Sequence, residues 1–278
     1  MNGSMDARLH RRVQRYGWDL AADAYARHWH GPLAGVQGEV LALAAPALGE
    51  AVLDVACGAG VMAVAAAHAV GLAGRVLGVD LSDAMVQASR RRALDFSLSQ
   101  AAFERMDAEQ LQLPDAHFDL MLCTLGLMYV PDPDAALREL HRVLRPGGRA
   151  VLAVWGERAR CGWASLFGIV DAEVRSEVCP LFFGLGQGAT LERRCASAGL
   201  QVTQQRRRSD SLDYANAAEA CAAAFAGGPV ALAWSRFDAT VRERVQLRYL
   251  ASIASWRHDP GYCVPAEYLI VAAERPAR

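Results

Sequence analysis

The chain has 278 residues, of which 53% are hydrophobic and 21% are charged, so it is long enough for one or two domains with a large buried core. All 29 basic residues are arginine, which excludes every mechanism that depends on a lysine. The formal net charge of -1 argues against a partner such as nucleic acid that is bound through bulk charge.

The seven cysteines are an odd number, lie far apart and form no C-x-x-C pair. This pattern is typical of free thiols in a reducing compartment, and it predicts neither a disulfide framework nor a metal site. The first twelve residues include basic side chains, but no apolar run follows them. We therefore expect no signal peptide and a cytoplasmic protein.

The first predicted element is helical and covers residues 1–45, with a Gly-Pro break at residues 31–32. Trp18, Ala22 and Tyr25 recur at helical spacing, which places them on one face of this segment.

Apolar runs and helical patterns then alternate along the chain. The predicted strands cover residues 51–56, 75–79, 102–106, 118–123 and 149–155. The predicted helices between them cover residues 61–70, 83–94 and 134–144. Repeated strand–helix units predict a parallel sheet with right-handed crossover connections, and strands this apolar are expected to be covered on both faces.

The pattern changes after residue 155. We predict helices at residues 161–178, 190–198, 217–225 and 239–256, with a glycine-rich loop at residues 181–188. Two further strands are expected at residues 200–206 and 268–273.

One segment, residues 55–74, imitates a membrane span, because it contains no acidic residue and no arginine and is long enough to cross a bilayer. Its residues are mostly alanine and glycine, which transfer weakly to lipid. We predict a buried strand end, a glycine turn and a core helix instead.

The most informative motif is the run VLDVACGAG at residues 52–60. Its glycines let backbone amides approach a ligand at the N-terminus of the following helix. Residues 58–63 match the G-x-G-x-x-A pattern of a dinucleotide site, and Asp80 lies where an acidic residue would bind ribose hydroxyls. This motif alone is compatible with NAD.

Three further features favour a different cofactor. Asp54 lies inside the first strand, where its carboxylate would repel a pyrophosphate but suit a cationic amine or sulfonium. Asp107 ends the third strand, where a carboxylate can accept a hydrogen bond from an adenine amino group. The sequence RPGG at residues 145–148 precedes the fifth strand.

With these features, residues 52–155 resemble the class I S-adenosylmethionine-dependent methyltransferases. The segments GVDLSDAMV, MDAEQLQLPDAHFDL and ALRELHRVLRPGGRAVLAVW are similar to the ubiquinone/menaquinone C-methyltransferase-like branch, which acts on small molecules. The resemblance implies an α/β, Rossmann-like fold. We expect a seven-stranded, mostly parallel sheet flanked by helices, with a helical cap from the N-terminus and from insertions after strands five and six.

The resemblance also implies roles for single residues. At the methionine end of the cofactor, Asp54 binds the amine, Ala56, Gly58 and Gly60 line the arm, Cys123 offers its backbone carbonyl to the amine, and Tyr25 covers that end. At the other end, Asp80 binds the ribose hydroxyls, Leu81 and Met85 contact the adenine, and Asp107 and Ala108 face its amino group. Ala56 departs from the family, which often has glycine there, and the loop should tolerate it.

The expected domains are an N-terminal helical lid at residues 1–45, a cofactor-binding core at 46–156, and the remainder of the sheet at 157–278, with cap insertions at about 157–188 and 212–262. The cap is rich in apolar and aromatic side chains: Trp18, Trp29, Trp163, Phe167, Phe182, Phe183, Trp234 and Tyr262. Such a lining favours a small, apolar or aromatic acceptor in a dry pocket.

A phenol or an acidic carbon as the acceptor would need a general base. The candidates are His28 and His30 on the lid, His258 in the last cap insertion, and Tyr129 just past strand four. Each histidine could equally be an ordinary surface residue.

The sequence thus predicts an S-adenosylmethionine-dependent methyltransferase that acts on oxygen, carbon, nitrogen or sulfur of a small molecule and releases S-adenosylhomocysteine. We expect a monomer or homodimer with no nucleic-acid partner and no membrane span. Two alternatives stay open. One is an NAD-dependent oxidoreductase, in which Asp54 and Asp107 would have no role. The other is a cofactor-binding scaffold or regulator that transfers no methyl group.

Overall fold

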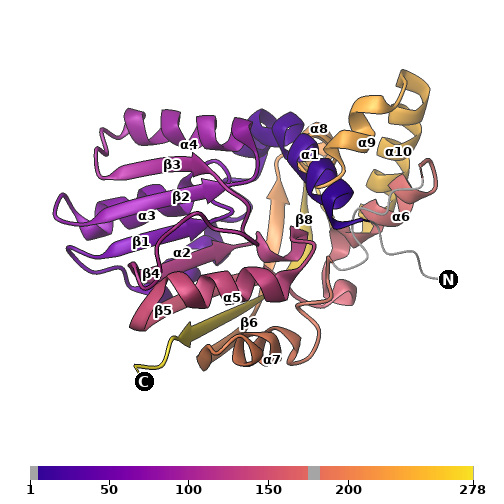
Figure 1. Cartoon of the computed structure of the whole chain (residues 1–278). Coiled ribbons are helices and arrows are strands. Elements are labelled where there is room, and N and C mark those ends of the chain that lie inside the picture. The colour runs from indigo at the N-terminus through magenta and orange to yellow at the C-terminus, as the bar shows by residue number, and fades with distance from the viewer. Residues whose placement is uncertain (1–5, 175–181, 278) are drawn as a thin grey trace.

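The computed structural model describes residues 6–174 and 182–277, and its centre is a single twisted sheet (Figure 1). The strands are β1 (Ala51–Val55), β2 (Arg75–Asp80), β3 (Ala101–Arg105), β4 (Phe118–Thr124), β5 (Leu144–Trp155), β6 (Gln201–Tyr214), β7 (Arg257–His258) and β8 (Gly261–Glu274). Their order is β3-β2-β1-β4-β5-β8-β6, and the two-residue β7 pairs with β8 outside this path.

Strands β1 to β5 are parallel, whereas β8 runs antiparallel to both β5 and β6. The prediction of a seven-stranded, mostly parallel Rossmann-like sheet is therefore confirmed. The strand order reverses between β1 and β4, and sheets of this type bind ligands at the carboxyl ends of the strands beside such a reversal.

The last two long strands extend further than the sequence predicts. Both β6 and β8 have 14 residues, and they stay paired from Gln201 opposite Glu274 to Tyr214 opposite Tyr262. The strand β6 is an edge strand with mostly polar and exposed side chains, so the hydrophobic pattern of the sequence does not reveal most of this strand. The segment that joins β6 to β8 consequently begins after Tyr214.

Helices cover both faces of the sheet. The α-helices are α1 (Ala7–His28), α2 (Ala34–Ala44), α3 (Val61–Val70), α4 (Asp83–Asp95), α5 (Pro133–Val143), α6 (Ser165–Asp171), α7 (Thr190–Ser197), α8 (Ala217–Cys221), α9 (Ala231–Arg236) and α10 (Ala239–Ser252). Short helical turns are η1 (Leu127–Tyr129), η2 (Arg158–Arg160), η3 (Gly162–Ala164), η4 (Ala222–Ala226, a π-helix) and η5 (Ala254–Trp256). The helix predicted at residues 161–178 corresponds to η3 followed by α6. Residues 175–178 of this prediction, and residue 181 of the predicted glycine-rich loop, lie outside the described residues.

Two predicted helix starts have the expected capping groups. The Ser82 hydroxyl accepts a hydrogen bond from the Met85 backbone N–H at 3.1 Å, which begins α4. The Asp132 carboxylate caps α5 by accepting from the Ala135 N–H at 3.0 Å, with Pro133 at the first helical position. These caps fix where the chain turns away from the carboxyl edge of the sheet.

The N-terminal helix α1 lies across the top of the molecule in Figure 1, against α4 on one side and α9 on the other. Asp19 joins α1 to the start of α4, because its Oδ1 accepts from the Ser82 hydroxyl at 2.7 Å and from the Ala84 N–H at 3.2 Å. Residues far apart in the sequence therefore meet at the carboxyl edge of β1 to β3.

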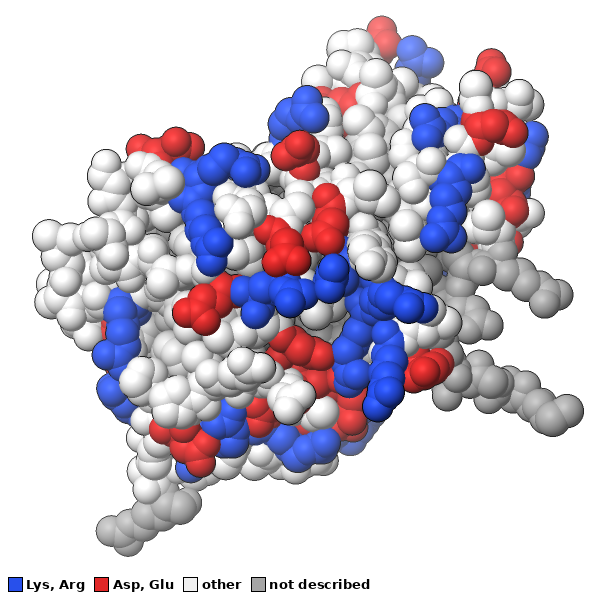
Figure 2. Space-filling view, turned by 45° about the horizontal axis from the view of Figure 1, so that its top comes forward, with Lys and Arg blue, Asp and Glu red and all other residues white. Residues whose placement is uncertain are grey.

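Residues 55–74, whose length and lack of charge suit a membrane span, instead form the end of β1, a glycine loop and the ten-residue α3, as predicted. None of the helices within the described residues combines the length and apolar character that crossing a bilayer requires. On the face drawn in Figure 2, arginine and acidic side chains lie interspersed, as the near-zero net charge suggests.

Candidate functional site

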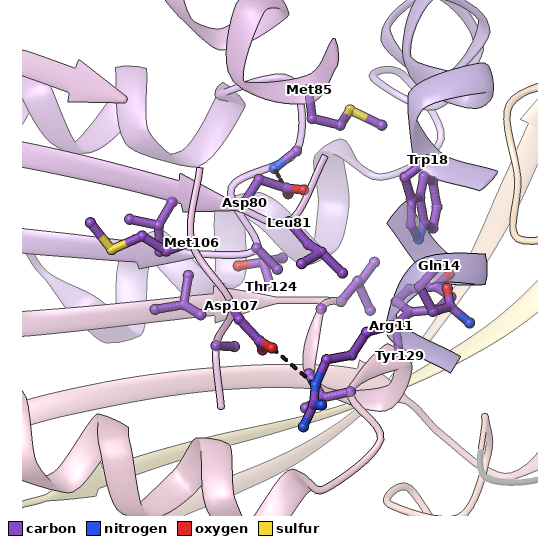
Figure 3. A pocket seen from close by; sticks show the side chains of 18 of the residues that line it. Arg11, Gln14, Trp18, Asp80, Leu81, Met85, Met106, Asp107, Thr124 and Tyr129 are labelled. Atoms are coloured by element: carbon purple, nitrogen blue, oxygen red, sulfur yellow. Dashed lines mark hydrogen bonds and ion pairs between the residues drawn. The ribbon is translucent and has the colours of Figure 1, made fainter. Parts of the chain in front are cut away.

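A pocket of about 770 Å³, its open mouth included, lies at the carboxyl ends of the parallel strands. The loop after β1, the ends of β2 and β3, the segment after β4 and one face of α1 form its wall (Figure 3). The residues predicted for the site that line it are Tyr25, Ala56, Gly58, Asp80, Leu81, Met85, Asp107, Ala108 and Tyr129.

Asp80 is the fixed carboxylate of this pocket. Its Oδ2 accepts from the Gly58 N–H at 2.9 Å, and its Oδ1 accepts from the Ser82 N–H at 2.9 Å. Burial raises the pKa of Asp80 to about 6, against the lowering effect of these hydrogen bonds. The two backbone donors hold the carboxylate toward the pocket, where its remaining lone pairs can accept from ligand hydroxyls.

Asp54 is buried in β1 with 1% of its surface exposed. Its Oδ2 has no hydrogen-bond partner within the described part of the chain. Burial, with the nearby Asp80 carboxylate, raises the pKa of Asp54 to about 8, although a backbone hydrogen bond from Ala63 lowers it. An unpaired buried carboxylate oxygen is costly, and a cationic donor would satisfy it.

A second, smaller hollow of about 360 Å³, open space included, adjoins the first. Asp54 lines this hollow and does not line the main pocket. The two spaces share five wall residues, Tyr25, Ala56, Gly58, Thr124 and Leu125. The carboxylates of Asp54 and Asp80 therefore lie at adjoining ends of one composite site.

The glycines of the β1–α3 loop have different roles. Gly58 has φ +54° and lines the pocket, where an added Cβ would lie 3.5 Å from the Tyr25 ring. Gly60, with φ +79°, does not line the pocket. An added Cβ there would approach Ser89 of α4 to 2.9 Å, so Gly60 allows α3 and α4 to pack closely.

Asp107 follows β3, and both of its oxygens have partners. Its Oδ1 accepts from the Glu109 N–H at 2.9 Å, and its Oδ2 pairs with Arg11 Nε of α1 at 2.9 Å. Arg11 also forms an ion pair with Glu109. Burial raises the pKa of Asp107, and the Arg11 charge partly offsets this effect.

One face of α1 lines the pocket along its length, through Arg11, Gln14, Trp18 and Tyr25 (Figure 3). Tyr25 and Trp18 are among the residues predicted for the site region, whereas Arg11 and Gln14 are not. A signal was present, because the spacing of three and four residues that links Trp18, Ala22 and Tyr25 continues backward to Gln14 and Arg11.

The segment after β4 contributes Thr124, Leu125, Gly126 and Tyr129 to the pocket wall. Cys123 is 2% exposed and is not among the residues lining either space. The role predicted for Cys123 belongs to its backbone carbonyl and stays a prediction, and the side chain that lines both spaces at this end of β4 is that of Thr124. The Thr124 Oγ1 is buried and has no hydrogen-bond partner among the residues that the structure describes.

The three candidate histidines lie elsewhere. His28 is in the last turn of α1, His30 is exposed in the turn after it, and His258 is exposed in β7. None of them lines the pocket described above. Among the four candidates for a general base, the structure brings only Tyr129 to its wall.

The predicted aromatic cap divides into two groups. Trp29, Trp163, Phe167, Phe182 and Phe183 form one buried cluster with Trp155, with ring centroids 4.7–6.5 Å apart in the contacting pairs. Trp234 instead stacks on Phe225 at 4.9 Å, away from this cluster, and Tyr262 is buried in β8. Trp18 is the member that borders the main pocket.

Comparisons with known proteins agree with this geometry. Residues 52–148 match the family model described as a methyltransferase domain. Over 105 residues the chain is 41% identical to the ubiquinone/menaquinone biosynthesis C-methyltransferase UbiE of Pseudomonas putida, which covers 37% of this chain and 41% of that protein. The chain therefore matches less than half the length of this relative.

Two solved structures share the fold over most of the chain. The YcgJ protein of Bacillus subtilis superposes with a TM-score of 0.59 and 17% identity, covering 86% of this chain and 97% of that one. A geranyl diphosphate methyltransferase in complex with S-adenosylmethionine gives a TM-score of 0.52 and 19% identity, covering 87% and 84%. At these identities the likeness establishes the fold alone.

Proposed function

We propose that the protein transfers a methyl group from S-adenosylmethionine to a small, largely apolar or aromatic acceptor, because residues 52–148 match the model of a methyltransferase domain. The observation that carries this proposal is the unpaired Oδ2 of Asp54, buried beside a pocket that also contains Asp80 and Asp107. The carboxyl group of Asp54 offers no favourable partner to a pyrophosphate, whereas a ligand with ammonium, hydroxyl and amino donors can pair with all three acidic groups.

The described residues fit such a cofactor along its length. Asp54 would bind the amine at one end, and Asp80 would accept from the ribose hydroxyls. Asp107 and Ala108 would face the adenine amino group, with Leu81 and Met85 packed against the ring. The shared wall of the two spaces keeps these groups in one continuous site.

When bound, S-adenosylmethionine supplies a methyl group already activated by its positively charged sulfur. The chain then has to align the acceptor in line with that methyl group and keep water out, and positioning of this kind can contribute about 7–11 kcal/mol. Methyl transfer from this cofactor therefore depends more on an enclosed pocket than on strong acid–base groups.

A closed circuit of aromatic contacts supports the exclusion of water. Each ring contacts the next at a centroid distance of 5.0–6.5 Å in the order Trp18, Tyr129, Phe182, Trp163, Trp29, Tyr25 and back to Trp18. This circuit joins α1 to the segment after β4 and to the region after β5. Because it borders the pocket through Trp18, Tyr25 and Tyr129, it favours an acceptor with an apolar or aromatic body.

Tyr129 is the residue that we propose to meet the acceptor. It lines the pocket and contacts Trp18 at 5.0 Å and Phe182 at 5.2 Å. Its hydroxyl could orient an acceptor oxygen or nitrogen through a hydrogen bond, or, after ionising to the tyrosinate, take the proton that the acceptor loses. A Tyr129→Phe variant separates these roles from packing, because it keeps the ring and removes the hydroxyl.

The proposal is tested in two steps with the full chain. S-adenosylmethionine and S-adenosylhomocysteine should raise the melting temperature, and NAD should not. Purified protein with methyl-labelled S-adenosylmethionine should then transfer label to a member of a panel of phenols, carboxylates, amines and thiols. Stabilisation by NAD would favour the oxidoreductase alternative, and binding without transfer to any member would favour a scaffold.

A further inference from the structure

We infer that Glu267, a buried acidic residue of β8, is a positioning residue for the acceptor side of the pocket. Its carboxylate holds two segments in place, residues 157–164 after β5 and residues 182–188 before α7. These segments carry Trp163 and Phe182, two rings of the aromatic circuit described above. The inference rests on the proposed function, because that proposal assigns the circuit to the exclusion of water and to the acceptor.

Glu267 lies in an apolar part of the sheet. Its strand is paired on both sides, with β5 and β6, and the residue is 3% exposed between Ala266 and Tyr268, at 2% and 0%. A carboxylate in such surroundings is unfavourable unless charges and hydrogen bonds compensate it. Glu267 lines neither of the two spaces of the site, so contact with a ligand there does not account for it.

The first set of contacts joins Glu267 to the segment after β5. Its Oε1 accepts from the Glu157 N–H at 3.0 Å, and its Oε2 lies 3.3 Å from the Nε of Arg160. Its backbone carbonyl accepts from the Gly156 N–H at 2.6 Å and from the Cys161 thiol at 3.7 Å. The chain is therefore held to β8 on both sides of η2, directly before η3.

The second set of contacts passes through Arg207 of the edge strand β6. Its Nη1 donates to Glu267 Oε1 at 3.2 Å, and its Nη2 donates to the carbonyls of Gly186 and Gly188 at 2.8 Å each. A planar guanidinium can serve a carboxylate and two carbonyls at once. The segment also packs directly on the end of β5, because a Cβ added to Gly186 would lie 2.0 Å from the Trp155 carbonyl oxygen.

The two segments that Glu267 holds contact each other and the pocket wall. The rings of Trp163 and Phe182 have centroids 5.7 Å apart, and Phe182 contacts Tyr129 at 5.2 Å. Tyr129 lines the pocket. Glu267 thus reaches the acceptor only through these rings, and one carboxylate sets the place of both segments.

Hydrogen exchange of the full chain, read by mass spectrometry, tests whether Glu267 holds both segments. Glu267→Gln keeps the shape of the side chain and removes its charge, and Arg160→Gln and Arg207→Gln each remove one cation. Glu50→Gln is the matched control. The Glu50 carboxylate pairs with Arg149 at 2.6 and 2.8 Å, but it lies directly before β1, at the edge of the sheet opposite the pocket.

We expect residues 157–164 and 182–188 to exchange at least about tenfold faster in Glu267→Gln, because the two arginines lose the buried charge that holds them. Arg160→Gln should speed exchange mainly in residues 157–164, and Arg207→Gln mainly in residues 182–188. Glu50→Gln should leave both segments at the wild-type rate.

Steady-state kinetics then separate positioning from a loss of folded protein. The acceptor used is the member of the panel above that the wild type methylates fastest. In Glu267→Gln the KM for this acceptor should rise about tenfold, whereas the KM for S-adenosylmethionine should stay unchanged. A smaller folded fraction would lower kcat alone.

Wild-type exchange rates in both segments of Glu267→Gln would overturn the inference, as would equal changes in Glu50→Gln or a lower kcat at unchanged acceptor KM. Such results would leave the proposed function standing if the wild type methylates a member of the panel. A wild type that binds no S-adenosylmethionine would contradict the proposed function instead, and the exchange pattern would still decide whether Glu267 holds the two segments.

Discussion

Arg11 of α1 and Asp107 after β3 form an ion pair across the mouth of the pocket, with 2.9 Å between Nε and Oδ2 (Figure 3). The two residues are nearly one hundred positions apart in the sequence, and their contact holds the N-terminal helix over the carboxyl edge of the sheet. Arg11 also pairs with Glu109, so one arginine joins α1 to two acidic residues of the segment after β3, of which Asp107 lines the pocket.

Replacing Arg11 should loosen this closure and also destabilise the fold. Both partners of the pair with Asp107 keep about a third of their side-chain surface exposed, so that pair contributes no more than about 1 kcal/mol. The Glu109 side chain is only 4% exposed, so Arg11→Gln leaves a buried carboxylate without its cation and should cost about 3 kcal/mol of unfolding free energy. We expect S-adenosylhomocysteine to dissociate several-fold faster, as measured by stopped-flow fluorescence. Arg8→Gln, at an exposed position of the same helix, is the matched control. Unchanged dissociation in Arg11→Gln would show that the pair does not hold the cover closed.

The stability of the ligand-free protein should depend on pH through Asp54. The folded state raises the pKa of this carboxyl from 3.8 to about 8, so folding favours the protonated form. Its contribution to stability is therefore fully present below about pH 4 and is lost as the pH rises toward 8. Asp54→Asn lacks this titration and should gain stability relative to the wild type by about 1–3 kcal/mol between pH 5 and pH 8.

Urea denaturation at several pH values measures this difference directly. Asp80, whose pKa is raised to about 6, titrates in both proteins and cancels from the comparison to a first approximation. A wild type and an Asp54→Asn variant that lose stability in parallel between pH 5 and pH 8 would contradict the account of Asp54 as a buried, unpaired carboxyl group.

Gly126 should be intolerant of a side chain because of Ala56. A Cβ added to Gly126 would lie 2.3 Å from the Ala56 Cβ, and Ala56 itself has φ +55°, a conformation that favours glycine. Gly126→Ala should therefore destabilise the protein by about 2 kcal/mol or more. Ala56→Gly alone should be neutral or slightly stabilising, because it relieves backbone strain.

The double variant distinguishes this contact from other effects. Ala56→Gly combined with Gly126→Ala should regain most of the lost stability, since the clashing Cβ is gone, and a double-mutant cycle by thermal denaturation gives the coupling. Additive effects of the two changes would mean that Gly126 is required for a reason other than Ala56.

The parts of the site that depend on local sequence could be predicted. The loop from Asp54 to Gly60 and the carboxylate of Asp80 follow short apolar strands, and strand, turn and helix signals lie within a few residues of one another. The parallel arrangement of the strands follows from the same alternation, and the family resemblance implies a Rossmann-like sheet. The ion pair between Arg11 and Asp107, in contrast, joins distant segments that no local pattern connects.

Three other differences have simple physical causes. The sequence does not mark Thr124 as a wall residue, because every residue from Leu120 to Cys123 of β4 is buried and the alternation of side chains cannot be read from hydrophobicity. The long edge strand β6 is polar over most of its length, and its extent is set by pairing with β8. His258 is predicted to lie in the cap because of its place in the chain. In the structure it is exposed in β7, which pairs with β8.

Calorimetric titration of the wild type and of Asp80→Ala with S-adenosylmethionine tests the central claim most directly. The account predicts one binding site per chain in the wild type and an affinity at least tenfold lower in Asp80→Ala, because that carboxylate is held toward the pocket by the Gly58 and Ser82 amides. An absence of binding by the wild type, or binding of NAD in place of S-adenosylmethionine, would contradict it.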